Sequence, residues 1–336
     1  LGNSVAGAGT LTIDTGATAR AMSHNSLGQG TGTLSPLFVN GGTFEGAEYN
    51  HISQISMTGG SIVQRSGISV VDGLDMKVFN TLNPSITTNA SATQANISLK
   101  ISNSSAGPLT ATVADGAAAT DLSISAAIVG TRGLIKAGAG TLNLSGANTY
   151  AGGTTLNQGT LTVGTGGSLG ATTGALAVNN TNTGTGTDAV LNLATAVNTT
   201  TGSLSGTIAS PSGGINTATI NTQAGRTLTV NQIADGTFAG VIAGAGDFIL
   251  GSSSTNTLTL TGANTYTGTT TVSAGTLALV GGSQASPITV STGASLSFTL
   301  GSPTTSISAS SRIFFRPSRM MVWSSAITMR VMRSCS

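Results

Sequence analysis

The chain carries very little charge. Only 7% of its 336 residues are Asp, Glu, Lys or Arg, whereas an average soluble domain has about 25%. Residues 1–311 hold seven Lys and Arg against all ten acids, and residues 312–336 hold five Arg and no acid. The main part of the chain therefore offers no basic surface, and we expect no nucleic acid among its partners.

Cysteine, aromatic residues and long apolar runs are also scarce. Cys335 is the one cysteine, and aromatic residues make up 4% of the chain. A body without cysteine fits export through an oxidising compartment. The sequence has no apolar stretch of about 18 residues, which excludes a membrane-spanning helix. It starts at Leu1 without a visible signal peptide, so we interpret it as a fragment or a mature form.

Glycine, threonine, serine, asparagine and alternating aliphatic residues are abundant instead. The 48 glycines, together with Thr, Ser and Asn, disfavour helices. In strings such as Thr141–Leu144, Thr160–Val163 and Ala189–Leu193 the apolar residues lie two apart, so they share one face of a strand. Gly-rich turns separate these strings. The pattern predicts an all-β fold, either a parallel β-helix or an antiparallel β-sandwich.

A repeated phrase favours the β-helix. Residues 138–163 read GAGTLNLSGANTYAGGTTLNQGTLTV, and residues 257–279, at the end of a second copy spanning 244–279, read TLTLTGANTYTGTTTVSAGTLAL. A chain that repeats a strand–turn–strand unit is usually a stack of similar units, at roughly 20–25 residues per turn of the stack. We therefore predict a right-handed parallel β-helix with Gly/Thr/Asn-rich turns, with the antiparallel β-sandwich as the alternative.

The composition divides the chain into two regions. Residues 1–311 form the predicted β-helical repeat region. Residues 312–336 differ abruptly, because they hold the only Trp, the only Cys and four of the seven Met. We interpret this basic tail as frame-shifted or disordered. A basic segment that lies on a membrane surface is the alternative.

The repeated phrase resembles the autotransporter-associated β-strand repeat of bacterial autotransporter passenger domains. The match runs over Gly138–Leu144, Gly146–Tyr150 and Gly159–Leu161, and again over Leu258–Leu260 and Gly262–Tyr266. The resemblance implies a β-helix at the bacterial cell surface, which a C-terminal β-barrel translocator in the full-length parent exports through the outer membrane. It implies a non-catalytic stalk or adhesin without a cofactor. Host or cell-surface glycans or proteins would be its targets.

The repeat residues receive structural roles. Glycine permits unusual backbone angles, asparagine can satisfy turn groups or form ladders, and the tyrosines could cover the flank of the rod. The structural motif residues are Gly146, Asn148, Tyr150, Gly262, Asn264 and Tyr266.

One segment matches a hydrolase motif. Residues 166–170 read GGSLG, the G-x-S-x-G pattern around a nucleophilic serine, here Ser168. The hydrolase order requires a histidine after the serine. Both histidines, His24 and His51, precede Ser168, so we do not assign it a catalytic role.

Acidic residues offer three further candidates. Glu45, Glu48 and His51 have metal-ligand spacing only on a helix, and their Gly-broken segment indicates a solvated loop. Asp72 and Asp75 could form a carboxylate pair, but VDGLD reads more simply as a turn. Residues 184–190 resemble one calcium-binding nonapeptide without a following copy. We expect no catalytic, cofactor-binding or metal-binding residue.

Two other functions remain open at this stage. A β-helical polysaccharide hydrolase or lyase would bring Glu45, Glu48, Asp72 and Asp75 within about 5–10 Å of one another in a groove. A truncated gene product would have no function.

Overall fold

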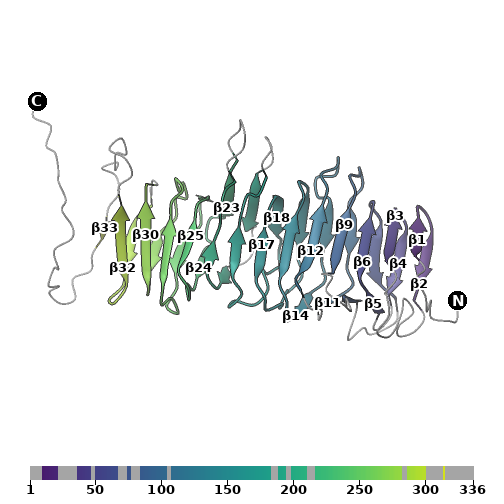
Figure 1. The fold of residues 1–336 in the computed structure, drawn as a ribbon, viewed down its shortest axis with the longest axis horizontal. Helices are drawn as coiled ribbons and strands as arrows, with labels where there is room; N and C mark the ends of the chain where they lie inside the picture. The colour runs from purple at the N-terminus through teal and green to yellow at the C-terminus, as the bar shows by residue number, and fades with distance from the viewer. Residues whose placement is uncertain are drawn as a thin grey trace, which may run out of the picture.

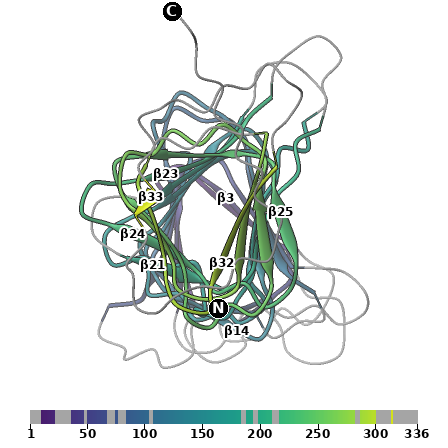
Figure 2. The same cartoon turned by 90° about the vertical axis from the view of Figure 1, so that its left-hand side faces the viewer.

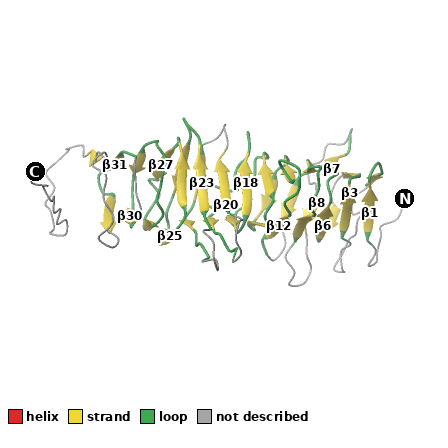
Figure 3. Cartoon of the chain, turned by 90° about the horizontal axis from the view of Figure 1, so that it is seen from above, coloured by secondary structure: helices red, strands yellow, loops and turns green. Residues whose placement is uncertain are grey.

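The protein is an elongated β-solenoid in the computed structural model, with β1 at one end and β32 at the other (Figure 1). The structure describes residues 10–21, 36–46, 50–66, 74–76, 84–103, 107–182, 188–193, 198–209, 216–281, 286–299 and 313–314. All secondary structure in these ranges is strand, and none is helix (Figure 3). This agrees with the abundance of residues that form helices poorly.

The strands form three faces around a common core (Figure 2). Face 1 is a nine-stranded sheet that continues, through the parallel bridge between Gly206 and Phe238, into a four-stranded sheet. Its strands are β1 (Leu11–Asp14), β3 (Leu37–Asn40), β6 (Gln54–Met57), β9 (Ser85–Thr88), β12 (Leu109–Val113), β15 (Leu134–Ala137), β17 (Thr154–Leu156), β19 (Leu176–Val178), β22 (Leu204–Ser205), β25 (Gly236–Phe238), β28 (Thr257–Leu260), β30 (Thr276–Val280) and β32 (Ser295–Thr299).

Face 2 is a single ten-stranded sheet. Its strands are β2 (Thr18–Arg20), β4 (Thr43–Gly46), β7 (Ser61–Gln64), β10 (Ala95–Ile97), β13 (Leu122–Ile124), β16 (Thr141–Leu144), β18 (Gly159–Val163), β20 (Ala189–Leu193), β23 (Ala218–Thr222) and β26 (Val241–Gly244).

Face 3 consists of a four-stranded and a six-stranded sheet, joined by turns that continue the stacking through backbone hydrogen bonds. Its strands are β5 (Asn50–Ile52), β8 (Leu74–Met76), β11 (Ile101–Asn103), β14 (Ile128–Gly130), β21 (Thr199–Thr201), β24 (Thr227–Val230), β27 (Asp247–Leu250), β29 (Thr270–Val272), β31 (Ile288–Val290) and β33 (Ile313–Phe314).

All pairings between these named strands are parallel, and each turn of the solenoid stacks on the one before. Leu37 pairs with Ile55, and Ile55 also pairs with Ile86. The turn of the solenoid from Ile55 to Ile86 is therefore much longer than the turn from Leu37 to Ile55. In the second repeat copy Leu258 pairs with Leu277 across another short turn. The predicted parallel β-helix is confirmed, and the antiparallel β-sandwich is wrong for the described part of the chain. The turns vary more in length than the sequence analysis expected.

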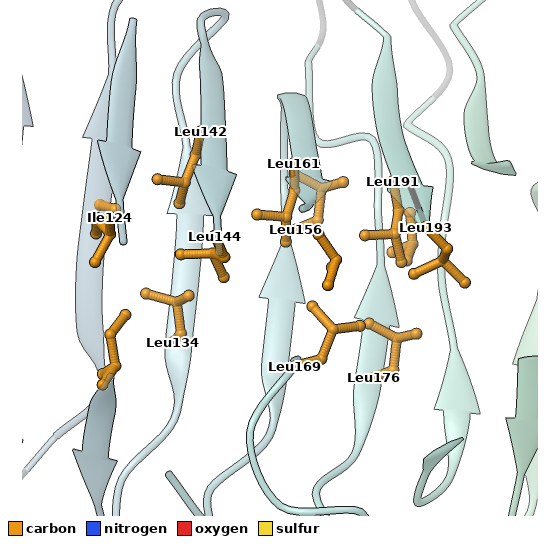
Figure 4. Close-up of a cluster of buried hydrophobic side chains, with 14 of the residues drawn as sticks. Ile124, Leu134, Leu142, Leu144, Leu156, Leu161, Leu169, Leu176, Leu191 and Leu193 are labelled. Atoms are coloured by element: carbon orange, nitrogen blue, oxygen red, sulfur yellow. The ribbon is translucent and has the colours of Figure 1, made fainter. Parts of the chain in front are cut away.

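The core is a set of columns of aliphatic side chains that run along the rod. On face 2, Leu142, Leu161 and Leu191 are register partners in successive turns, and each is fully buried (Figure 4). Parallel strands stack about 4.8 Å apart, so each leucine contacts its partners above and below. Full burial of one such side chain stabilises the fold by about 1.5–3 kcal/mol. The period-2 pattern of the sequence produces this core directly.

The basic tail enters the described structure only at Ile313–Phe314. This pair forms β33, which is in parallel register with Ile288 and Thr289 of β31. The other tail residues lie outside the described ranges, so the division at residue 311 stays a prediction. The described residues contain no helix long and apolar enough to cross a membrane.

Candidate functional site

Asn148 of the first repeat connects three consecutive turns of the rod. Its Oδ1 accepts a hydrogen bond from the backbone N–H of Ile128 at 2.8 Å, and its Nδ2 donates to the backbone oxygen of Ser168 at 2.7 Å. The hydroxyl of Ser168 donates to the backbone oxygen of Asn148 at 2.7 Å. Asn148 is only 3% exposed. A buried amide that pairs with backbone groups above and below satisfies polar groups of the corner that would otherwise be costly to bury.

Asn264 makes the corresponding contact in the second copy. Its Oδ1 accepts from the backbone N–H of Ile242 at 2.9 Å, and its side chain is also buried. For these asparagines the sequence predicted bonds to turn backbone groups or ladders between turns, and the contacts are of that kind. We propose that both residues act as corner ladders, with no role in chemistry.

The tyrosines do not cover the flank of the rod, as the sequence analysis expected. Tyr150 and Tyr266 are 0% and 1% exposed. The Tyr150 hydroxyl donates to Thr154 Oγ1 at 2.6 Å, because that threonine hydroxyl donates in turn to the backbone oxygen of Leu169 at 3.2 Å. Burial raises the pKa of Tyr150 well above its ordinary value. The flank prediction is wrong because both rings lie inside the core. At Tyr150 the absence of a side chain on Gly170 makes room for the ring, since a Cβ atom there would lie 2.6 Å from ring atom Cε2.

Tyr266 repeats this arrangement. Its hydroxyl is hydrogen-bonded to Thr270 Oγ1, and Thr270 Oγ1 lies 2.8 Å from Ser286 Oγ. Its ring centroid is 6.2 Å from that of Phe248 in the previous turn. Both copies therefore place a phenol inside the core and satisfy its hydroxyl with a threonine of the following strand.

The glycines of the motif allow the backbones of successive turns to approach closely. A Cβ atom on Gly146 would lie 2.2 Å from the backbone oxygen of Ala126, and one on Gly262 would lie 1.9 Å from that of Gly240. No side chain fits at these distances. The glycine requirement at these two positions is thus one of space between turns.

The two copies lie on different faces of the rod. The first copy opens with β16 on face 2 and places Asn148 on face 3, beside β14. The second opens with β28 on face 1 and places Asn264 on face 2, beside β26. The phrase is therefore a unit of stacking that any face can accommodate.

Lys136 is a buried titratable residue that was not among the candidates predicted from the sequence. It lies in β15 with its side chain directed inward and 0% exposed. Its Nζ donates to the backbone oxygens of Ala137 at 3.0 Å, Gly138 at 2.7 Å and Gln158 at 3.0 Å. Burial lowers the pKa of Lys136 to about 7, and the nearby Asp121 carboxylate opposes this shift. The one available signal was its place two positions after the inward Leu134.

Ser168 has a structural partner in place of a catalytic one. Its hydroxyl is used in the contact with Asn148 described above. Its chain neighbour Leu169 is buried in the core. The strand-to-helix turn that exposes a hydrolase nucleophile is absent from this described segment. His24 lies outside the described residues.

Glu45 and His51 lie on different faces, in β4 and β5, so they do not share the side of a helix. The Arg20 Nε–H donates to Glu45 Oε2 at 2.5 Å, and this hydrogen bond lowers the pKa of the half-buried Glu45 carboxyl. His51 is 9% exposed, so the solvated loop expected there is wrong at this residue. Glu48 lies outside the described residues.

The remaining candidates are partly outside the described residues. Asp75 is in β8 and is the register partner of His51, so the expected turn is wrong at this position; Asp72 is outside. In the nonapeptide-like segment residues 184–187 are outside, and Asp188 accepts from the backbone N–H of Thr217 at 2.8 Å. No group of three His, Cys, Asp or Glu residues in the described ranges could hold a metal ion.

Comparison with known proteins gives two findings for this chain. The model of the passenger-associated-transport repeat family matches residues 134–163 and 253–279. The chain is also similar to the adhesin BmaC autotransporter of Brucella suis biovar 1 (strain 1330), with 36% identity over 162 residues. This match covers 48% of the chain but only 4% of the much longer relative. No solved structure matches the chain.

Proposed function

Because the chain carries the repeat of bacterial autotransporter passenger domains, which are displayed on the cell surface, we propose that it is a non-catalytic rod in an adhesin. The observation that carries the proposal is the continuous parallel solenoid, with a matched passenger repeat in two of its segments. In the full-length parent a membrane translocator would export it. The rod would act as a stalk and present its sides to surface targets.

The construction of the rod suits export as an unfolded chain. Each turn buries its leucines on the turn before, so folding can proceed turn by turn as the chain emerges. Asn148 bonds to the turn below and the turn above. Such contacts would hold each new turn in register and oppose backward movement of the exported chain.

The outer surface of face 2 supports a role in adhesion through hydrogen bonds. One register line along this face consists of hydroxyl and amide side chains that are exposed or half-buried: Thr18, Thr43, Ser61, Asn96, Ser123, Asn143, Thr162, Asn192 and Asn221. These groups donate and accept hydrogen bonds without charge. Glycans and protein backbones at a host or cell surface offer the complementary groups. Tyr150 and Tyr266 take no part in this contact, since both are buried.

The test uses the bacterium that makes the protein. Antibodies raised against the whole chain are applied to intact cells, before and after treatment with an external protease. Adherence is then compared between the parent strain, a strain with an in-frame deletion of the segment, and the complemented strain. We expect protease-sensitive labelling and lower adherence of the deletion strain. Labelling only after cell lysis would refute the surface location, and unchanged adherence of the deletion strain would refute the adhesive role.

A further inference from the structure

A groove crosses three consecutive turns at the corner where face 3 leads into face 1. Its volume is about 300 Å³, at the small end of the range for ligand sites in proteins. Its lining residues come from three turns of the rod, around Gly107, Arg132 and Gly153. These three residues lie just before β12, β15 and β17, respectively. The groove therefore lies on the outside of the first repeat copy.

Glycine makes this groove possible. A Cβ atom on Gly133 would lie 2.6 Å from the backbone oxygen of Gly153, and Gly153 has a φ of +84° that other residues rarely adopt. The backbones of adjacent turns therefore meet closely at the floor, without side chains above them. A ligand can reach backbone groups here that side chains cover elsewhere on the rod.

The groove carries a cation and two hydroxyls. The exposed Arg132 lies at its edge, and Thr131 and Thr155 supply hydroxyl groups. A guanidinium group pairs with a carboxylate through two parallel hydrogen bonds. Pro108 and the half-buried Ile135 add a small apolar surface. One positive charge surrounded by hydroxyls and a little apolar surface suits an acidic sugar.

The second repeat copy provides an internal comparison. Phe248 pairs with Thr270 there as Leu134 pairs with Thr154 in the first copy. Asp247 consequently takes the place of Gly133, and Thr269 takes the place of Gly153.

These two residues fill the corner with side chains and place a carboxylate in it. Asp247 Oδ1 accepts hydrogen bonds from the Thr269 backbone N–H at 2.6 Å and from its hydroxyl at 2.8 Å. The glycine floor beside Arg132 is thus a property of the first copy. It does not follow from the repeat pattern, which both copies share.

We propose that this groove binds a carboxylate-bearing sugar unit of an acidic polysaccharide, with Arg132 holding the carboxylate and Thr131 and Thr155 contacting sugar hydroxyls. The proposal rests on the adhesive function proposed above and names its target class. A peptide is the less suitable occupant. It would bind such a sheet by adding a strand, but β12, β15 and β17 are each paired on both sides.

The test measures binding of the full chain to immobilised polygalacturonate and to its fully methyl-esterified form, which has the same sugar backbone without charge. The variants are Arg132→Gln, Thr155→Val and Arg226→Gln. Arg226→Gln is the matched control, because it removes the same charge from a different part of the rod. Far-ultraviolet circular dichroism checks that each variant is folded.

We expect wild type and Arg226→Gln to bind polygalacturonate, and Arg132→Gln to bind it about tenfold or more weakly. Thr155→Val should weaken binding by a smaller factor, and added salt should weaken it further. Equal binding by wild type and Arg132→Gln, or equal binding of the esterified polymer, would overturn the proposal. Binding of an acidic peptide in place of the polysaccharide would overturn it as well.

The failure of the groove and the failure of the adhesive function are distinguishable. If a strain that carries Arg132→Gln in the chromosome adheres as the parent does, only the proposal for the groove is refuted. If a strain that lacks the whole segment still adheres, the proposed adhesive function itself is refuted.

Discussion

Lys136 should make the stability of the rod depend on pH in a way that a methionine at this position abolishes. Burial lowers the pKa of Lys136 to about 7 in the folded protein, whereas an unfolded lysine has a pKa of about 10.4. Between these two values the unfolded chain binds more protons than the folded one. The free energy of unfolding therefore rises with pH across this window, and the cost of the buried charge is fully present below pH 7.

The size of the effect follows from the same shift. Each pH unit inside the window adds about 1.4 kcal/mol, so the rise from pH 7 to pH 9.5 is about 3 kcal/mol as an upper estimate. Lys136→Met removes the titrating group at nearly the same volume and should remove this slope. The measurement should stop below pH 10. Above it Tyr150, whose pKa is raised in the folded state, produces the opposite trend.

Urea unfolding of the full chain, followed by circular dichroism at pH 6, 7, 8, 9 and 9.5, provides the assay. The quantity of interest is the difference in unfolding free energy between wild type and Lys136→Met at each pH, because other titrations cancel in it. The same pH dependence of the unfolding free energy in wild type and in Lys136→Met would refute the reasoning. It would mean that the three backbone oxygens around Nζ compensate the burial and keep the pKa of Lys136 near its ordinary value.

Three further changes test the stacking of the turns. Asn148→Ala should lower the free energy of unfolding by about 1–3 kcal/mol, since it leaves the Ile128 N–H and the Ser168 oxygen without this partner; urea unfolding measures it. Gly262→Ala should cost about 1–3 kcal/mol or more and lower the melting temperature, because the new methyl group meets the oxygen of Gly240. Deletion of residues 258–276 should leave a shorter but folded rod, as Leu277 then takes the place of its register partner Leu258; scattering and circular dichroism report this.

Each of these changes has a control in the same chain. Asn143→Ala removes a half-buried amide on the outer side of β16 and should cost less than Asn148→Ala. Gly164→Ala meets only the side chain of Asn143 at short distance, which can move, so it should be tolerated better than Gly262→Ala. Deletion of 258–277 shifts the strand by one position, so that Ala278 takes the place of Leu258 and Leu279 faces outward; it should destabilise this end more than the deletion of 258–276. Equal effects within any of these pairs would contradict the stacking geometry.

The class of fold could be predicted from the sequence because it depends on local periodicity. Strings such as Thr141–Leu144 alternate apolar and polar residues, and the structure buries Leu142 and Leu144 while Thr141 and Asn143 face outward. The repeated phrase then indicated stacking of similar units. Both signals are carried by neighbouring residues, so they need no knowledge of distant contacts.

Only the tertiary structure decided where these units lie around the rod. The turns between the two copies have unequal lengths, so the same phrase begins on face 2 in one copy and on face 1 in the other. Which side chain stands above a given glycine, or which corner receives a tyrosine, depends on that accumulated length. The interior position of Tyr150 follows from it.

The groove at Arg132 shows the same division. The sequence by itself determined that a glycine-rich turn follows each SGANTY-like phrase, since glycine favours turns wherever it occurs. The tertiary structure decided that this turn in the first copy meets two earlier turns beside Arg132, and that Asp247 and Thr269 fill the corresponding corner in the second copy. The physical reason is that strand formation depends on residues close in sequence, whereas a surface site depends on the register between neighbouring turns. That register joins residues separated by a full circuit of the rod, such as Leu134 and Thr154.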